Sequence, residues 1–505
     1  MEGTNGKYGR ILAILCLVAA VVAFTQAPQN AIADNTKSNA KVKNVILMIA
    51  DGAGFNQYLA ADYYQYGTTG KQVYEKFPFQ AAVSTYEYEW KTFTADGLTP
   101  LSFEIYGYDT NLAWSDFGYA IQTNPLNPAY INTATDSASA ATAMATGFKT
   151  KDGAIGYAFD QAMNLVSMPN IVEYAESLGK ATGVITSVPF SHATPAGFVA
   201  HNASRDNYAA IANEMLKTSG VDVIMGCGAP DYGYSGEKPP AFPTNVKYVG
   251  GNATWTEIQT GSVAGADANG DGTPDAWTVI RDKSAFQAMA TGPTPARVFG
   301  LPKTYQSLQY YRGFPTPNNS DQPYQVPFTS NIPTLEEMTK AALNVLDNDN
   351  DGFFLMIEGG AVDWAAHFYQ PGRMIEEHID FNHSVEAVVD WVQRNSNWGE
   401  TMVIVTADHE TSYLWGHGSN PDWEPIVNNG AGVMPDMHFY SDIGGFGWHS
   451  NSLVPLFAKG DAARLFNGYA KNVDIERGPY IDNTDIFGII KYSMGNYAEK
   501  PGNKK

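Results

Sequence analysis

Short apolar runs recur along the chain, and each is bounded by turn-forming or charged residues. Runs of this length with no polar face are typical of the buried strands of a parallel sheet. Segments with helical spacing of apolar residues lie between them, as in MPNIVEYAESLG at 168–179. This alternation predicts an α/β fold with a large, mostly parallel central sheet and helices on both faces. The predicted strands are 44–50, 181–187, 222–226, 353–358 and 401–408.

Polar residues close three of these predicted strands. Asp51 and Glu358 end two of them, and Asp408 with His409 ends a third. In open α/β sheets, ligands gather at the carboxyl ends of the strands. These residues are therefore the first candidates for a functional site.

Two stretches interrupt the alternation and predict loop-rich insertions. Residues 86–130 are rich in Tyr, Phe and Trp, and residues 229–333 are rich in Pro, Gly, Asn and Asp. The insertions either shape the mouth of a site or a subunit interface, or form ordinary surface loops. The chain has 505 residues, a length that large α/β enzymes reach by inserting segments into one domain. We therefore predict one domain with insertions over 34–505.

The N-terminus has the pattern of a secretory signal peptide. Lys7 and Arg10 precede the apolar stretch 11–24, and the small-residue triplet at 31–33 follows. The apolar run is shorter than the ~20 residues that a spanning helix needs. We predict cleavage of 1–33, no membrane span afterwards, and an exported protein that is periplasmic or extracellular.

Net charge and cysteine content limit the possible partners and disulfides of the protein. The formal net charge is −21, so nucleic acid is not an expected partner. An acidic protein that binds an anionic substrate needs local positive charge, which metal ions supply. Of the two cysteines, Cys16 leaves with the leader, so no internal disulfide is expected, and Cys227 in VIMGCG should be a buried thiol.

The segment TATDSASAATAMATG predicts a helix that begins beside a serine. Asp136 and Ser137 precede an Ala-rich stretch that Gly147 should end. At a helix N-terminus, free backbone N–H groups and the helix dipole stabilise an oxyanion or a phosphoryl group. Either residue could instead serve only as an N-cap.

Histidines are scarce, with nine in the chain, and three of them favour a metal centre. DWAAH places Asp363 and His367 four residues apart, so on a helix they would share one face and could bind one ion. His409 follows Asp408 directly, and WHS contains His449 just before the strand-like NSLVPLF. His417 in LWGHG is a rival for His449, whereas the remaining histidines are expected to be structural or on the surface; these are His201, His378, His383 and His438.

Six motifs, in order along the chain, resemble those of alkaline phosphatases: IADGAG, TDSASAATAMATG, ATPAGFVAHNASR, FFLMIEGGAVDWAAH, TADHET and WHSNSLVPLFAKG. The resemblance covers most of the chain outside the two insertions. It implies the fold of that family and hydrolysis of small phosphate monoesters at alkaline pH through a phosphoserine at Ser137. A homodimer is compatible with it.

The resemblance also implies two zinc ions and a third ion, usually magnesium. Nitrogen and oxygen ligands suit zinc, and an oxygen-rich shell suits a hard cation. The implied ligands are Asp363, His367 and His449 for one zinc, Asp51, Asp408 and His409 for the other, and Asp51, Thr194 and Glu358 for the third ion.

Arg205, in HNASR, would hold two phosphoryl oxygens through its planar guanidinium. The chain departs from the best-known bacterial pattern in having His192 in place of an Asp and Trp364 in place of a Lys. His192 adds an imidazole beside the third ion, so zinc or cobalt could compete there with magnesium. Trp364 removes a cation near the phosphate.

Two acidic segments resemble calcium loops. DNDNDGFFLMIE at 347–358 matches the EF-hand pattern, but its apolar run predicts a buried strand, so we reject calcium there. DANGDGTPD at 267–275 fits either a short calcium loop or, as we prefer, an Asx and Gly turn.

Three other functions compete with monoester hydrolysis. A phosphodiesterase of the same superfamily is the nearest, although such enzymes commonly use Thr and lack the Arg. A sulfatase would need a CxPxR-like string, which is absent. A phosphate-binding protein that has lost catalysis should have lost ligands, and all of them are present.

Overall fold

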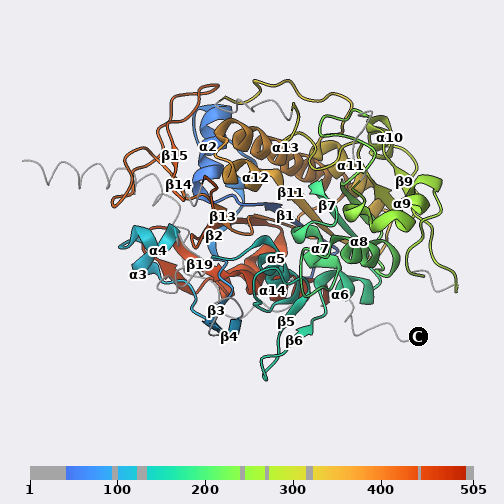
Figure 1. Cartoon of the computed structure of the whole chain (residues 1–505), viewed down its shortest axis with the longest axis horizontal. Coiled ribbons are helices and arrows are strands. Elements are labelled where there is room, and N and C mark those ends of the chain that lie inside the picture. The colour runs from blue at the N-terminus through green and yellow to red at the C-terminus, as the bar shows by residue number, and fades with distance from the viewer. Residues whose placement is uncertain are drawn as a thin grey trace, which may run out of the picture. The chain divides into compact units, whose positions relative to one another are not determined.

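A sheet of 11 strands forms the centre of the part of the chain that the structure describes (Figure 1). The structure, a computed structural model, describes residues 41–93, 100–121, 134–238, 245–267, 272–313, 322–441 and 445–495. In spatial order the strands are β18 (Asn472–Asp474), β19 (Gly478–Asp482), β2 (Phe79–Ser84), β17 (Val454–Lys459), β12 (Thr401–Thr406), β1 (Asn44–Ala50), β11 (Phe353–Gly359), β7 (Ala181–Pro189), β8 (Val223–Cys227), β10 (Val298–Gly300) and β9 (Thr278–Ile280).

The sheet is mostly parallel, as the sequence predicts. From β12 through β1, β11, β7, β8 and β10 to β9, all neighbours pair in parallel, whereas β17 is antiparallel to both β12 and β2. All five predicted strands are present. β12 is shorter than expected and ends at Thr406, so Asp408 and His409 lie just beyond it.

Every residue of β1, β11 and β12 is buried, as their apolar sequences require. The register aligns their carboxyl ends, because Ile49 of β1 pairs with Glu358 of β11 on one side and with Thr406 of β12 on the other. Residues that follow these strands therefore meet at one edge of the sheet.

Helices cover both faces of the sheet (Figure 1). One face carries α2 (Phe55–Tyr66), α11 (Leu335–Leu346), α12 (Ala361–His367) and α13 (Pro371–Asn395). The opposite face carries α5 (Ser137–Thr146), α6 (Ile171–Ser177), α7 (Ala193–Val199) and α14 (Asn483–Gly495). Near the end formed by β8, β10 and β9 lie α8 (Tyr208–Lys217), α9 (Gly251–Thr260) and α10 (Lys283–Met289).

The prediction that 229–333 is only a loop-rich insertion is wrong in part. This stretch contributes β9 and β10, and β10 pairs with β8 to extend the central sheet. Both strands have three residues, too few to produce a recognisable apolar run. The first predicted insertion holds a separate hairpin and two short helices: β3 (Tyr88–Phe93), β4 (Pro100–Ile105), α3 (Thr110–Ala113) and α4 (Phe117–Ile121).

Other expectations have mixed outcomes. The predicted leader and residues 268–271 of the acidic loop 267–275 lie outside the described residues. Cys227 is buried, and its thiol donates to the carbonyl oxygen of Ser187 at 3.4 Å. The segment 353–359 is a buried strand, which agrees with the rejection of an EF-hand. Among the helices that the structure describes, none is both long and apolar enough to cross a membrane.

Candidate active site

Ser137 is the first residue of α5, as the sequence predicts. Asp136 caps the helix, with its Oδ1 accepting from the backbone N–H of Ser139 at 2.8 Å, and Gly147 ends the helix at φ 79°. The hydroxyl oxygen of Ser137 lies 3.2 Å from Nε2 of His409. A small residue is required where α7 crosses α5, because a Cβ at Gly197 would come within 2.7 Å of the Ala141 side chain. The serine therefore sits at a fixed helix N-terminus, facing an imidazole.

Asp363 and His367 share one face of α12, also as predicted, with 3.1 Å between Oδ2 and Nε2. His449, from the short strand β16 (His449–Ser450), places its Nε2 3.1 Å from that of His367 and 3.5 Å from Asp363 Oδ1. Nδ1 of His449 donates to the carbonyl of Thr135 at 2.7 Å, and Nδ1 of His367 donates to the carbonyl of Gly447. In neutral rings both Nε2 lone pairs then point toward Asp363, the arrangement of metal-binding histidines.

The second predicted group, Asp51, Asp408 and His409, also comes together. Nε2 of His409 lies 3.6 Å from Asp51 Oδ1 and 3.2 Å from Asp408 Oδ2. Backbone N–H groups of Gly52 and His409 donate to Asp408 Oδ1 at 3.0 and 2.9 Å and fix its orientation. Burial, followed by the charges of Asp408 and Asp363, raises the pKa of Asp51 well above its usual range. Burial likewise raises the pKa of Asp408 to about 6.

Glu358, Thr194 and His192 lie around the same strand ends. Thr186 donates a short hydrogen bond to Glu358 Oε2, and burial raises the pKa of Glu358 to about 7. His192 is the N-cap residue of α7, and burial with the charge of Arg205 lowers its pKa to about 3. The imidazole is therefore neutral and can act as a ligand.

Five buried polar atoms in these groups have no hydrogen-bond partner among the described residues. Native proteins rarely leave such atoms unpaired, and bound ions are a common reason when they do. Their carboxylate, hydroxyl and imidazole chemistry fits divalent cations. The atoms are Asp51 Oδ1, Asp408 Oδ2, Glu358 Oε1, Thr194 Oγ1 and His192 Nδ1.

The two zinc groups implied by the resemblance adjoin each other. Ligand atoms of Asp363, His409 and His449 all lie within 4.8 Å of one another, as do those of Asp51, Asp408 and His409. The rings of His409 and His449 stack, with 3.6 Å between their centroids. His409 thus stands between the two groups.

Arg205 reaches the start of α5. Its Nη1 donates to Asp136 Oδ2 at 2.7 Å, and the two side chains are 21% and 11% exposed. Burial acts against the charge of both groups, but their mutual attraction outweighs it. The pKa of Arg205 is raised and that of Asp136 is lowered. The guanidinium is therefore charged and held beside Ser137, in reach of an anion at the helix N-terminus.

Asp136 also belongs to a cluster of three acidic side chains that the sequence did not predict. Atoms of Glu87, Asp136 and Asp152 lie within 4.8 Å of one another, and Ser139 donates a short hydrogen bond to Glu87. The charge of Asp136, followed by burial, raises the pKa of Asp152 to about 6. Glu87 falls at the edge of the stretch assigned to an insertion, and no local pattern indicates its contact with α5.

His417, the rival ligand, is not brought to these groups. Its side chain is 58% exposed, and its Nε2 lies 3.1 Å from Asp436. Of the other histidines, His201 contacts Glu214 and the carbonyl of Met168, as a structural residue should. His378 is fully buried with neither ring nitrogen hydrogen-bonded within the described chain.

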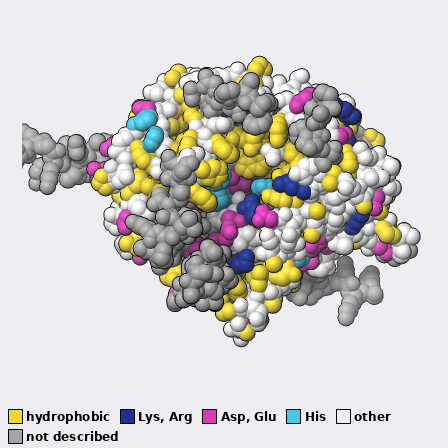
Figure 2. All heavy atoms as spheres, in the orientation of Figure 1, with side chains coloured by type: hydrophobic (Ala, Val, Ile, Leu, Met, Phe, Trp, Pro, Cys, Tyr) yellow, Lys and Arg dark blue, Asp and Glu magenta, His cyan; other side chains and the backbone are white. Residues whose placement is uncertain are grey.

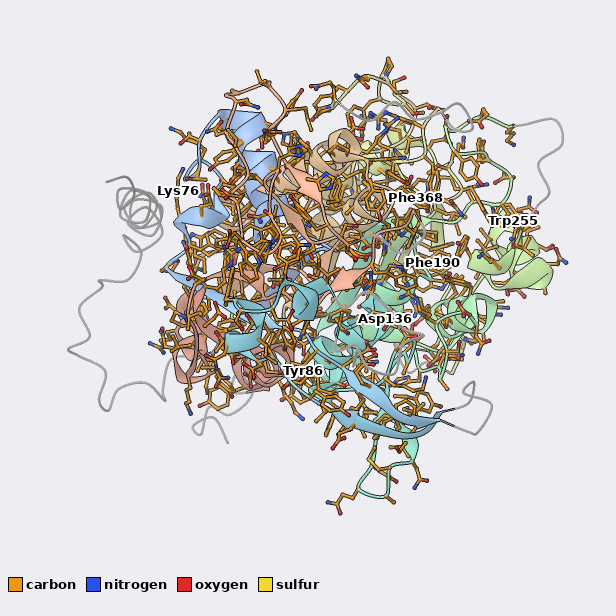
Figure 3. The ribbon with its side chains drawn as sticks, turned by 60° about the vertical axis from the view of Figure 1, so that its left-hand side comes forward. Lys76, Tyr86, Asp136, Phe190, Trp255 and Phe368 are labelled. Atoms are coloured by element: carbon orange, nitrogen blue, oxygen red, sulfur yellow. The ribbon has the colours of Figure 1, made fainter. Side chains whose placement is uncertain are left out.

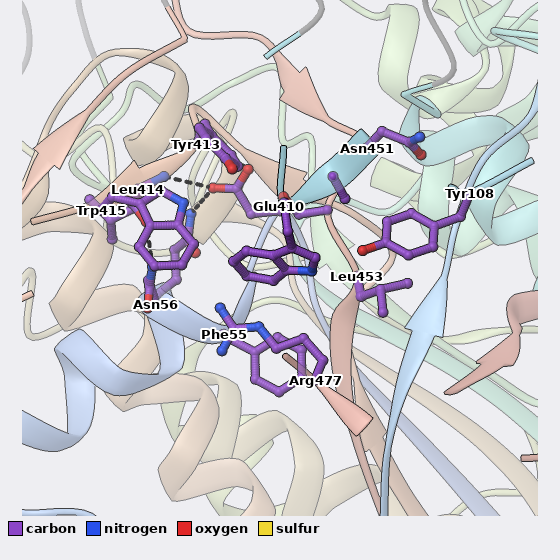
Figure 4. A pocket seen from close by; sticks show the side chains of 14 residues that line it. Phe55, Asn56, Tyr108, Glu410, Tyr413, Leu414, Trp415, Asn451, Leu453 and Arg477 are labelled. Atoms are coloured by element: carbon purple, nitrogen blue, oxygen red, sulfur yellow. Dashed lines mark hydrogen bonds between the residues drawn. The ribbon is translucent and has the colours of Figure 1, made fainter. Parts of the chain in front are cut away.

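Glu410, next to His409, forms part of the wall of a separate pocket (Figure 4). Its carboxylate accepts from Gln57, from Ser450 and from the backbone of Tyr413 and Leu414. The guanidinium of Arg477, in the same pocket, lies 4.3 Å from the ring centre of Phe55. Neither Ser137 nor Arg205 lines this pocket, so it is distinct from the site above.

Two views locate the site. Figure 2 shows a central group of His, acidic and basic side chains bordered by hydrophobic ones. In Figure 3 the labelled Phe368 and Asp136 mark the end of α12 and the start of α5, the two layers from which the site is built.

A family model and curated relatives both match this chain to alkaline phosphatases. The model of the alkaline phosphatase family matches residues 105–432. Alkaline phosphatase 4 of Bacillus subtilis is 28% identical over 436 residues, which are 85% of this chain and 75% of the relative. Alkaline phosphatase of Escherichia coli is 27% identical over 490 residues, or 92% and 89% of the two chains.

Solved structures agree in fold. A variant of the alkaline phosphatase from the Antarctic bacterium TAB5, solved with magnesium bound, is similar at a TM-score of 0.53 and 23% identity. The match covers 90% of this chain and 98% of that one.

Proposed function

The chain belongs to the alkaline phosphatase family, and we propose that Ser137 is the nucleophile with which it hydrolyses phosphate monoesters. One observation carries this assignment: Ser137 begins α5, and its Oγ lies 3.2 Å from His409, a member of a cluster of carboxylates and imidazoles. A helix N-terminus binds phosphoryl oxygens, and a hydroxyl beside a cation site is readily deprotonated.

In this proposal Oγ of Ser137 attacks phosphorus in line, the ester P–O bond breaks, and the alcohol leaves with a proton. A water molecule then attacks the phosphoserine, releases inorganic phosphate and restores the serine. Arg205 and the N–H groups at the start of α5 hold the non-bridging oxygens in both steps. Asp136 keeps Arg205 in place through the 2.7 Å hydrogen bond.

The chemistry of the clusters supports three cation sites. Bound divalent cations would lower the pKa of the attacking hydroxyl and offset negative charge on the phosphoryl group and on the leaving oxygen. Unpaired buried atoms in the second zinc group and at the third site are what such ions would satisfy. We assign zinc to Asp363, His367 and His449, and a second zinc to Asp51, Asp408 and His409.

For the third ion we propose magnesium, held by Asp51, Thr194 and Glu358. The TAB5 variant that binds magnesium in its M3 site carries an aspartate in place of a histidine, so this choice rests on the oxygen donors of Asp51, Thr194 and Glu358. His192 adds a nitrogen donor nearby, so zinc or cobalt would compete with magnesium.

We also propose that residues 1–33 are a leader that is removed on export, and that small phosphate monoesters are the substrates. N-terminal sequencing of the secreted protein tests the leader. The oligomeric state, for which a homodimer is the expectation, is tested by light scattering.

The class of reaction is tested by comparing an aryl phosphate monoester with the matching diester at alkaline pH, with zinc and magnesium supplied. A large excess of monoester hydrolysis is expected, because Arg205 and the helix N-terminus bind a dianion. A comparable diester rate would reassign the enzyme to the phosphodiesterases. Labelling with radioactive phosphate should mark the wild type and not Ser137→Ala, and labelling of that variant would refute the role of the serine.

A further inference from the structure

Three aromatic side chains border the imidazole side of the active site. Phe368, Phe446 and Trp448, called the aromatic rim below, form a connected group. The Phe446 ring lies 5.3 Å from Phe368 and 5.7 Å from Trp448, and it stacks on the His367 ring at 4.4 Å and 16°. Phe368 is 49% exposed and Trp448 is 39% exposed. The rim therefore presents apolar surface to solvent directly beside a cluster of polar groups.

The same contacts that orient His367 fix the position of the rim. The backbone N–H of Gly447 donates to the carbonyl of His367 at 2.9 Å, and the carbonyl of Gly447 accepts from His367 Nδ1. A Cβ at Gly447 would lie only 1.7 Å from the Ser412 hydroxyl, so a side chain there would force Ser412 to move. The backbone N–H of Ser412 donates to the carbonyl of Trp448 at 2.9 Å. The segment is thus held against α12, and the aromatic rings project from a fixed backbone.

The aromatic rim and Ser137 lie beside different histidines of the site, which determines the part of the substrate that the rim can contact. Ser137 Oγ contacts His409, whereas the rim stacks on His367 in the other group. In-line displacement places the leaving oxygen opposite the attacking one. The alcohol part of the ester therefore leaves toward the rim.

We propose that the aromatic rim is a subsite for the alcohol part of the ester and favours substrates whose alcohol carries an aromatic ring. The exposed rings of Phe368 and Trp448 can bury the apolar surface of an aromatic alcohol. Stacked or edge-to-face contacts between the rings would add to the binding free energy. This inference rests on the proposed function and specifies its substrate class. Figure 2 shows hydrophobic side chains along one border of the central polar group, in agreement with it.

The test compares two esters whose alcohols are both primary, 2-phenylethyl phosphate and ethyl phosphate, so that the leaving groups have similar reactivity. In the metal-loaded wild type, kcat/KM should be about tenfold higher for the phenyl ester, a difference equivalent to about 1.4 kcal/mol. The ratio should fall to about threefold or less in the Phe368→Ala, Trp448→Ala double variant. Phe446 is left unchanged because it stacks on His367.

Phe148→Ala is the matched control. Phe148 is also 49% exposed and follows the opposite end of α5 from Ser137, so its removal should leave the ratio at the wild-type value. The conservative variants Phe368→Tyr and Trp448→Phe should retain most of the preference. Competitive inhibition of the wild type by phenylphosphonate against methylphosphonate measures the same preference without any variant, and the phenyl compound should bind several-fold more tightly.

The outcomes separate the subsite from the proposed function. Hydrolysis of both esters with a ratio near one, or an unchanged ratio in the double variant, would overturn the subsite and leave monoester hydrolysis standing. Failure of the metal-loaded wild type to hydrolyse either ester would overturn both.

Discussion

Replacing Asp136 with Asn separates two roles of this residue, the capping of α5 and the positioning of Arg205. Asn keeps an oxygen that can accept from the N–H of Ser139, and Asn and Asp cap helices about equally well. It loses the negative charge that faces Nη1 of Arg205 at 2.7 Å. Freed from this partner, Arg205 must be ordered again whenever phosphate binds. Immobilising such a side chain costs about 0.5–1.5 kcal/mol, so phosphate affinity should fall by roughly three- to tenfold.

The assay is the competitive inhibition constant for inorganic phosphate, measured beside the melting temperature. Asp136→Asn should raise the inhibition constant and lower the melting temperature only through the lost ion pair, because the cap is kept. Asp136→Ala should raise the inhibition constant similarly but also lose the cap, which costs about 1 kcal/mol of stability. An inhibition constant within twofold of wild type in a well-folded Asp136→Asn variant would refute the positioning role.

Three further predictions concern metal binding and stability. Burial and nearby acidic charges raise the pKa of Glu377, whose Oε1 has no hydrogen-bond partner among the described residues, to about 8. The stability that the protonated carboxyl contributes is therefore lost as pH rises from about 4.5 through 8. Glu377→Gln should stabilise the protein by a few kcal/mol more at pH 9 than at pH 5 in urea unfolding, and an equal gain at both would contradict this. Removing divalent cations with EDTA should lower the melting temperature in calorimetry, with recovery on adding zinc and magnesium, because buried atoms such as Glu358 Oε1 lose their partner. Gly52→Ala should reduce the zinc bound per chain, measured by elemental analysis, because its Cβ would meet Thr411 Oγ1 at 2.7 Å. Gly70→Ala is the control: Gly70 has a similar positive φ with open space around it, so this variant should cost only backbone strain of about 1–2 kcal/mol.

The sequence predicts the centre of the fold better than its edges. Strands such as β1 and β11 are buried on both faces, and burial on both faces is what produces a continuous apolar run. β9 and β10 have three residues each; β10 depends on pairing with β8 and β9 on pairing with β10, and no local pattern reveals either contact. The failure to recognise β9 and β10 within the predicted insertion 229–333 follows from this difference.

The same division applies to the site. The pairing of Asp363 with His367 follows from a spacing of four residues on a helix, and the placement of Asp51 and Asp408 follows from their positions at strand ends. The approach of His449 to His367, and of Glu87 to α5, depends on tertiary packing. For His449 the family motif supplied the missing information, and for Glu87 nothing did.

The register of the central strands links the fold to the chemistry. A run such as FFLMI is apolar on both faces, so hydrophobicity alone does not distinguish one register of β11 from the next. Glu358 does distinguish them, because it pairs in register with Thr186 of β7 and accepts a hydrogen bond from its hydroxyl. A slip by one residue would turn Glu358 to the opposite face of the sheet and leave a buried carboxylate without that partner, which costs several kcal/mol. The residue proposed to bind the third ion thus also aligns the end of β11 with that of β7, the strand that leads to His192 and Thr194.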